Sequence, residues 1–376
     1  MPYEEALQQI IEDVVQPEAE RVDRDGIFPR KAVEAMGEAG LLGLTVPRES
    51  GGGGQTVRAA ADVVRRLAGS CGSTAMVVLM HYSATALITA VGTEEMRQDI
   101  ASGRHLTTLA FSEAGSRSHF WAPMGTATPR DGAIVLESSK SWVTSAGEAD
   151  SYVWSSRPAA SPGAMTLWLV DSKDPALSVT RRFDGLGLRG NHSAPVETKG
   201  LHVSQDRMLG ADGSGLDLAL TVALPWFLVL NAAASVGLAD AVVAETLQHL
   251  RGTRLEHLDQ SLAEQPVARA SAARMRIETD SARALLDKTV DALEQGLPEA
   301  QLLTLEVKAA AAETSAEVAD AALKVCGGAA FRKELGLERR FRDSRAARVM
   351  APTTDTLLDF TGRALLGLPL LDGGAQ

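Results

Sequence analysis

Three short stretches of the sequence combine residues that could contact a planar ligand. The first, residues 109–119, reads LAFSEAGSRSH and places small hydroxyl residues and a glycine just after a strand-like start. Backbone amides and hydroxyls in such a turn can reach a phosphate or the edge of a planar ring. An ordinary surface loop is the alternative explanation for these residues.

The second and third stretches carry an aromatic side chain and a pair of glycines. Residues 140–146, KSWVTSA, place Trp142 and Thr144 two positions apart, hence on one face of a strand. An indole can stack on an aromatic cofactor, and a hydroxyl can donate to a ring heteroatom. In residues 324–330, KVCGGAA, the glycines would allow close backbone approach at a helix end. A tryptophan packed in a barrel core and a plain helix cap are the respective alternatives.

The elements that must position these stretches follow from the hydrophobic pattern. Residues 4–103 repeat apolar side chains at helical spacing, whereas residues 106–210 contain short β-type runs split by Gly, Pro, Asp and Ser. Ala- and Leu-rich helices follow at about 216–252, 263–294 and 298–325, with a shorter pair around 338–348 and 354–366.

The pattern predicts an α+β, mainly α protein of three domains. We expect a helical N-terminal domain over residues 1–105, a small antiparallel barrel or sandwich over 106–212, and a four-helix bundle over 213–376.

Composition narrows the class of partner. The 376 residues carry 37 basic against 48 acidic side chains, a net charge of −11, and no basic cluster, so we expect neither a nucleic-acid nor a membrane partner. Cys71 and Cys326 lie far apart without a CxxC pair, which argues against a disulfide framework or a metal site. The acidic N-terminal stretch lacks the lysines of an export signal, so a cytoplasmic location is expected. The apolar stretch Leu216–Leu238 contains Asp217 and Pro225 and is interpreted as a buried helix.

Taken in order, the three stretches resemble motifs of the acyl-CoA dehydrogenase superfamily. Residues 112–118 are similar to its Thr-Glu-Pro-Gly-x-Gly-Ser turn, residues 140–144 to its Lys-x-Trp-Ile-Thr strand, and residues 326–328 to the end of its Gln-x-x-Gly-Gly segment. The Glu-Arg and Arg-Asp-Ser residues within 338–344 resemble the Glu-Arg and Arg-Asp-Ala that come after that segment in the family. The resemblance implies a helical domain, a β-barrel and a four-helix bundle, assembled as dimers or tetramers that hold flavin at a subunit interface.

The resemblance also implies which residues bind the flavin. They are Phe111, Ser112, Ser118, Trp142, Thr144, Lys324, Gly327, Gly328 and Thr353. The family's Arg-x-x-Phe-Gly, which holds the far half of FAD, falls on residues 255–259, LEHLD, although Arg254 lies one position away. Lys324 stands where the family has Gln. Both FAD and FMN are therefore kept as candidate cofactors.

Two features of the family's dehydrogenase chemistry are missing. Desaturating a thioester requires a carboxylate that removes the α-proton, and the family's two positions for this base fall on Ala351 and Phe227. The Asp and Arg that receive coenzyme A fall on Pro225 and Leu228, which cannot bind a phosphate. Asp355 and Asp359, near the first base position, are interpreted as helix-start or surface acids.

A retained flavin cluster without a base favours a different reaction. Some superfamily members are monooxygenases, which use reduced flavin and O2 and need a dry pocket rather than an α-proton base. The expected pocket residues are Tyr82, Trp226, Phe227 and Ala351. The candidate proton donors are His81, Ser118, His119 and His192, for which a core histidine, a surface loop or a turn is the alternative role.

Three functions are therefore weighed. The leading hypothesis is a monooxygenase or hydroxylase acting on a small molecule, supplied with reduced flavin by a separate reductase. The second is a dehydrogenase of a CoA-bound or carrier-bound thioester, with Asp355 or Glu113 recruited as base. The third is a non-catalytic scaffold. We expect a homodimer or homotetramer in each case.

Overall fold

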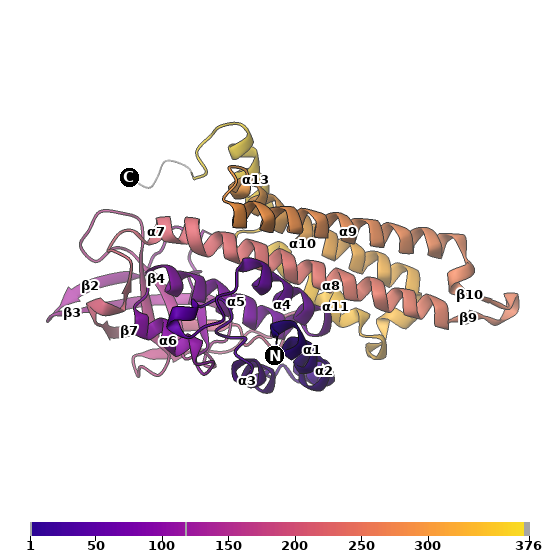
Figure 1. The fold of residues 1–376 in the computed structure, drawn as a ribbon, viewed down its shortest axis with the longest axis horizontal. Helices are drawn as coiled ribbons and strands as arrows, with labels where there is room; N and C mark the ends of the chain where they lie inside the picture. The colour runs from indigo at the N-terminus through magenta and orange to yellow at the C-terminus, as the bar shows by residue number, and fades with distance from the viewer. Residues whose placement is uncertain (1, 117–118, 372–376) are drawn as a thin grey trace.

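The N-terminal part of the chain is helical, as expected. The computed structural model describes residues 2–116 and 119–371. The helices of this part are α1 (Tyr3–Ile10), the π-helical segment Ile11–Val15, α2 (Gln16–Asp25), α3 (Arg30–Glu38), α4 (Val57–Ser70), α5 (Gly72–Val91) and α6 (Glu94–Ala101). They pack beside the sheets and the long helices in Figure 1.

The middle of the chain forms two four-stranded sheets. One has the strand order β1 (Thr107–Ala110), β4 (Ser151–Ser156), β5 (Thr166–Asp171), β8 (Met208–Leu209). The other has the order β2 (Thr126–Arg130), β3 (Ala133–Val143), β7 (Ala194–Val203), β6 (Leu177–Val179). The expectation of purely antiparallel pairing is wrong for one pair, since β1 runs parallel to β4. The long connection that a parallel pair needs is supplied here by β2 and β3.

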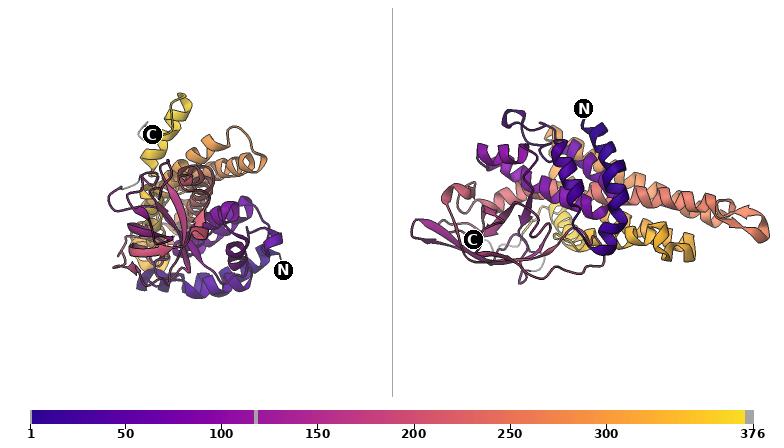
Figure 2. Two further views of the ribbon diagram at one scale, coloured as in Figure 1. Left: turned by 90° about the vertical axis from the view of Figure 1, so that its left-hand side faces the viewer. Right: turned by 90° about the horizontal axis from the view of Figure 1, so that it is seen from below.

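The C-terminal part is built on long helices at the expected places. It contains α7 (Gly215–Leu218), the π-helical segment Ala219–Ala223, α8 (Leu224–Gly252), the short strands β9 (Arg254–Leu255) and β10 (Gln260–Ser261), α9 (Pro266–Gln295), α10 (Ala300–Cys326), α11 (Leu337–Ser344), α12 (Ala346–Val349) and α13 (Thr354–Leu365). Helices α8, α9 and α10 lie side by side along the long axis, with the sheets near one end and the β9–β10 hairpin at the other (Figure 1). Figure 2 shows that their far ends extend beyond the N-terminal helices.

The core is centred on α5 and α8. Every residue of α5 from Gly72 to Ile88 is buried. Two helical segments, Gly72–Val91 and Gly215–Gly252, are long and apolar enough to cross a membrane by composition, but 78% of each apolar window is buried inside the protein. Helices buried to this extent are typical of a protein core. Gly237 lets α8 approach α4 closely, because a Cβ there would collide with the backbone carbonyl of Arg65.

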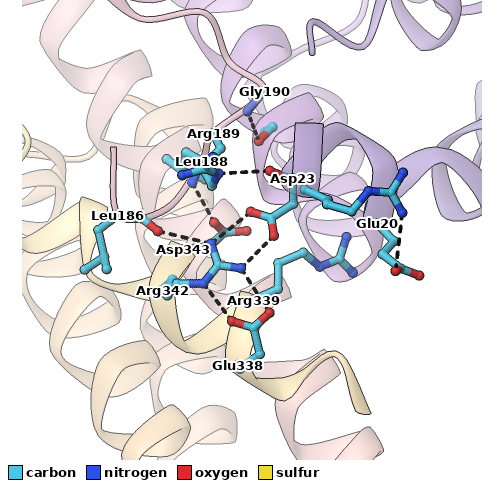
Figure 3. Close-up of polar contacts among 12 residues, drawn as sticks. Glu20, Asp23, Leu186, Leu188, Arg189, Gly190, Glu338, Arg339, Arg342 and Asp343 are labelled. Carbon is cyan, nitrogen blue, oxygen red and sulfur yellow. Dashed lines mark hydrogen bonds and ion pairs between the residues drawn. The ribbon is translucent and has the colours of Figure 1, made fainter. Parts of the chain in front are cut away.

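A polar cluster joins parts of the chain that are far apart in sequence (Figure 3). The Arg342 guanidinium of α11 makes two hydrogen bonds to Asp23 of α2, at 2.9 and 2.6 Å, and also pairs with Glu338. Next to it, Asp343 accepts a 2.6 Å hydrogen bond from the backbone N–H of Leu188. The Glu-Arg and Arg-Asp residues noted in the sequence therefore connect the C-terminal helices to the N-terminal helices and to the segment before β7.

Candidate active site

One pocket lies where the three parts of the chain meet. Its volume is about 530 Å³, counting space open to solvent. Its lining residues come from α5, from β1 and the segment after it, from the end of β3, from the π-helical segment Ala219–Ala223 and the start of α8, and from the segment before α13. They are Met80, Leu109, Phe111, Ser112, Phe120, Ser141, Trp142, Ala219, Ala223, Leu224, Phe227, Ala351 and Pro352. None of these described residues carries an ionisable side chain. The pocket can therefore bind an apolar or planar group, with hydroxyls and backbone groups as its polar contacts.

A β-bulge shapes the Trp142 side of the pocket. The pairing of β3 with β7 shifts register between Lys140 and Val143, and Trp142 adopts a φ of 58°. Bulges of this kind re-aim a side chain beside a site. The indole is 62% exposed and stacks on Phe183, with ring centroids 4.1 Å apart. Thr144 is buried instead, so the simple alternation expected from the strand pattern is broken here.

The first two motif stretches lie against each other. The backbone N–H of Ser141 donates a 2.8 Å hydrogen bond to the carbonyl of Ser112, and both residues line the pocket with Phe111. Behind them Thr144 Oγ1 lies 3.5 Å from Ser193 Oγ. The structure therefore brings together Phe111, Ser112 and Trp142 from stretches that are about thirty residues apart in the chain.

Glu113 is not free to act as a base. Its carboxylate is buried, lies 2.6 Å from Lys140 Nζ, and accepts a hydrogen bond from the backbone N–H of Met124 at 2.7 Å. Burial alone would raise the pKa of Glu113, but Lys140 and the backbone donors hold that pKa below its ordinary value. Burial in turn lowers the pKa of Lys140 to about 8. A paired, ionised carboxylate of this kind has no vacant position for a substrate proton.

The opposite wall is held in place by Lys308, a residue that the sequence pattern marks only as part of a helix. Lys308 is completely buried in α10 and donates to the carbonyls of Ala347 at 2.6 Å, Met350 at 3.1 Å and Pro352 at 2.8 Å. Its burial lowers the pKa of its ammonium to about 7. These bonds fix the segment that brings Ala351 to the pocket. A single lysine within an otherwise Val- and Ala-rich stretch was the available signal.

The remaining pocket candidates divide into two groups. Phe227 and Ala351 both line the pocket. Trp226 is partly buried against the core but does not line the pocket. Asp355 is exposed, and Asp359 is exposed and pairs with Arg363 at 2.8 Å. Neither aspartate lines the pocket.

His81 and Tyr82 lie in the core rather than at the pocket wall. His81 Nδ1 accepts a 3.1 Å hydrogen bond from the backbone N–H of Thr107, and Nε2 lies 2.9 Å from the carbonyl of Leu42. Burial lowers the pKa of His81 to about 4. The Tyr82 hydroxyl donates to a backbone carbonyl at 2.7 Å, and burial raises its pKa. Because both side chains are satisfied by backbone groups, we do not retain them as proton donor or substrate contact.

His119 and His192 also lie outside the pocket wall. His119 is exposed and packs edge-on against Trp121. His192 is buried, with Nδ1 2.8 Å from Glu148 Oε1 and Nε2 2.9 Å from Arg182. Burial, and then the Arg182 charge, lower the pKa of His192. Ser118 lies outside the described residues.

The third motif stretch is not brought to this pocket within one chain. Lys324, Gly327 and Gly328 are exposed at the end of α10, where Gly327 has a φ of 60°. Thr353 is the N-cap of α13, and its hydroxyl accepts a hydrogen bond from the Thr356 N–H at 3.3 Å. Arg254 pairs with Asp259.

The residues that line the pocket fit the ring portion of a flavin. A planar heteroaromatic ring needs an aromatic or apolar surface and a few hydrogen-bond partners at its edge. Phe111 and Trp142 supply the first, and Ser112 and Ser141 offer hydroxyls for the second. The fold and the site are those expected of a flavoprotein oxidoreductase.

Comparison with known families identifies which one. Residues 3–103, 108–201 and 213–366 match the family models for the N-terminal, middle and C-terminal domains of acyl-CoA dehydrogenase. The chain belongs to the acyl-CoA dehydrogenase family. The resemblance inferred from the three motifs and the fold class are thereby confirmed.

Individual relatives match over nearly the whole chain. The human mitochondrial short-chain specific acyl-CoA dehydrogenase is 27% identical over 90% of this chain and 83% of its own length. The probable acyl-CoA dehydrogenase YngJ of Bacillus subtilis is 26% identical over 94% of both chains. Among solved structures, butyryl-CoA dehydrogenase from Megasphaera elsdenii superposes with a TM-score of 0.91 at 20% identity, covering 96% of both chains. The prolyl acyl carrier protein oxidase AnaB superposes with a TM-score of 0.87 at 19% identity, covering 96% of this chain and 98% of its own.

Proposed function

We propose that this flavin-dependent oxidoreductase transfers an oxygen atom to a small molecule whose apolar part lies in the pocket. The observation that carries this proposal is the absence of any ionisable side chain among the described residues that line the pocket. One atom of O2 would enter the product, and the other would leave as water with two protons and two electrons. A bound flavin supplies the electron-transfer and oxygen-activating chemistry.

The lack of a base distinguishes oxygen transfer from thioester desaturation. Desaturation needs a group that accepts the α-proton within hydrogen-bond reach. By their spacing from the family-like motifs, Ala351 and Phe227 correspond to the family's two base positions. Both side chains line the pocket, and neither accepts a proton. Glu113 is paired with Lys140, and Asp355 is exposed away from the pocket. Oxygen transfer does not require a base that accepts an α-proton.

The chain's own residues would bind the ring, exclude water and orient the substrate. Phe111 and Trp142 offer the aromatic surface, and Ser112 offers a hydroxyl at its edge. Leu224 and Phe227 form an apolar wall from α8, which limits access of water to the reacting groups. Hydrogen bonds from Lys308 keep Ala351 at its place in this wall.

The cofactor-binding site would be completed by a second copy of the chain. Lys324, Gly327 and Gly328 are exposed at the end of α10 and do not reach this chain's own pocket. We therefore propose a homodimer or homotetramer in which they contact a flavin held by the partner. FAD is the family's cofactor. FMN is kept as an alternative because Arg254, which lies next to the position of the family's FAD-binding arginine, is already paired with Asp259. The buried free thiols of Cys71 and Cys326 fit a cytoplasmic protein.

A flavin assay under controlled oxygen tests the proposal. The purified protein is loaded with FAD or FMN, reduced without air, and then mixed with O2 and a panel of apolar amines, sulfides and phenols. We expect the product to carry one oxygen atom from ¹⁸O2. We also expect repeated turnover when a separate flavin reductase is supplied. Failure of every panel member to acquire labelled oxygen, together with rapid bleaching of oxidised flavin by an acyl thioester, would overturn it.

A thioester dehydrogenase is the second candidate. The names of the relatives favour it, since they are acyl-CoA dehydrogenases of similar length, and one structural neighbour is named an oxidase of an acyl carrier protein substrate. Bleaching of the oxidised flavin by butyryl-CoA, or by a butyryl carrier protein, would establish this activity. A colourless protein that takes up neither FAD nor FMN would instead indicate a non-catalytic scaffold.

A further inference from the structure

The helix that forms one wall of the pocket begins irregularly. Residues 219–223 are π-helical, and the backbone N–H of Leu224 donates to the carbonyl of Ala219, five residues back, instead of to that of Leu220. Regular α-helix then continues from Leu224 to Gly252. A π turn contains one residue more than an α turn, and such turns are frequent at functional sites.

Proline explains where the π turn lies. Pro225 is the second residue of α8, has no N–H to donate, and in a regular helix its ring would clash with the carbonyl of Thr221. The same arrangement occurs once more in the described part of the chain, far from the pocket. The π-helical segment Ile11–Val15 ends two residues before Pro17, and the N–H of Gln16 donates to the carbonyl of Ile11. Two independent occurrences connect the proline with the wider turn.

The π turn decides which side chain lies one turn before Leu224. In a regular α-helix that residue would be Leu220, four positions back. With the extra residue it is Ala219, and the pocket lining includes Ala219, Ala223 and Leu224. Leu220 is instead partly buried against the hydrophobic core. A small methyl group thus stands where a regular helix would place a larger side chain.

We propose that Pro225 is a specificity-determining positioning residue: by forcing the π turn it presents Ala219 to the pocket in place of Leu220. The pocket thereby admits an apolar group with more bulk than a regular helix would allow. The inference about substrate size rests on the proposed function, because it takes this pocket as the substrate site. The inference about pocket shape does not.

Crystal structures of matched variants, with xenon as an apolar probe of empty space, test the proposal. Xenon binds in apolar cavities of proteins independently of any reaction. In Pro225→Ala we expect the Leu224 N–H to bond to the Leu220 carbonyl and xenon occupancy in the pocket to fall at least about twofold. Adding Leu220→Ala to that variant should restore the occupancy. Pro17→Ala is the matched control and should leave the pocket and its xenon unchanged.

Each alternative result bears on the proposal. It is overturned if Pro225→Ala keeps the bond to Ala219, if xenon occupancy stays at the wild-type level, or if Leu220→Ala restores nothing. Should Pro225→Ala not fold, Ala219→Leu on the wild-type helix must lower the xenon occupancy at least about twofold, and an unchanged value would contradict the proposal. If the variants behave as expected but no oxygen transfer is found, the proposed function fails and the pocket-shaping role of Pro225 stands.

Discussion

Lys140 Nζ lies 2.6 Å from Glu113 Oε1, and neither side chain exceeds 4% exposure. The ammonium also donates to the carbonyl and the hydroxyl of Ser155, at 2.6 and 2.8 Å. The pair joins the two motif stretches that form the Trp142 side of the pocket. Buried charge in this part of the protein is therefore used to fix the backbone behind the pocket, and the pocket surface itself stays uncharged.

Removing one partner of this pair should destabilise the protein strongly. Glu113→Ala leaves the Lys140 ammonium buried without its counter-charge, and we expect a loss of about 3 to 5 kcal/mol in the free energy of unfolding. Urea unfolding followed by circular dichroism measures it. Glu197→Ala is the matched control, because Glu197 pairs with the exposed Lys199 at 3.8 Å, and should cost less than about 1 kcal/mol. Equal losses in the two variants would contradict this account of the buried pair.

Much of the fold follows from local pattern. The helices expected over 263–294 and 298–325 agree with α9 and α10 within three residues at each end. Long amphipathic or Ala-rich segments between Gly and Pro signals specify such elements without help from distant residues. The π turns were missed, although Pro17 and Pro225 inside helical patterns were available as a signal.

The parts that could not be predicted depend on contacts between distant residues. His81 is one of the proton donors expected from the sequence, but its two ring nitrogens meet the carbonyl of Leu42 and the N–H of Thr107, which are 39 and 26 residues away in the chain. The role of Lys308 depends on carbonyls about forty residues further on. The parallel pairing of β1 with β4 likewise has no local signature.

Lys308 should be required for the shape of the pocket wall. Lys308→Met keeps a side chain of similar length but leaves the carbonyls of Ala347, Met350 and Pro352 without their buried donor. We expect about 3 kcal/mol or more of destabilisation, measured by urea unfolding. We also expect higher mobility of residues 347–352, measured by faster hydrogen–deuterium exchange of that peptide. Lys199→Met, at an exposed lysine, should change neither quantity. Unchanged exchange of the 347–352 peptide in Lys308→Met would show that the wall is held by other contacts.

Asp343 should make stability depend on pH. Burial raises the pKa of Asp343 to about 6, above the ordinary value of 3.8. Between these two values the folded protein binds a proton at this site that the unfolded chain has released, so stability falls as pH rises through this range and stays lower above it. The loss is on the order of 2 to 3 kcal/mol. Asp343→Asn keeps an oxygen that can accept from Leu188 N–H (Figure 3) and should remove this part of the pH dependence.

The measurement is urea unfolding of both proteins from about pH 4 to about pH 7. Subtracting one curve from the other removes the contribution of groups that titrate alike in both. The Asp343→Asn protein should become more stable relative to wild type as pH rises. A difference that stays constant, or that changes in the opposite direction, would show that Asp343 is already ionised in the folded protein at the lower end of this range.

Trp142 should contribute to flavin affinity and very little to folding. Its indole is 62% exposed and contacts Phe183 on one face, so Trp142→Ala removes a stacking surface without opening a core cavity. Aromatic stacking is worth about 0.5 to 1.5 kcal/mol, which corresponds to a flavin dissociation constant raised about two- to tenfold. Quenching of flavin fluorescence on titration with the apoprotein measures this constant. Trp142→Phe is the matched control and should stay within about twofold of wild type, because a ring is retained. A Trp142→Ala protein that binds flavin as tightly as wild type, at an unchanged melting temperature, would place the flavin elsewhere.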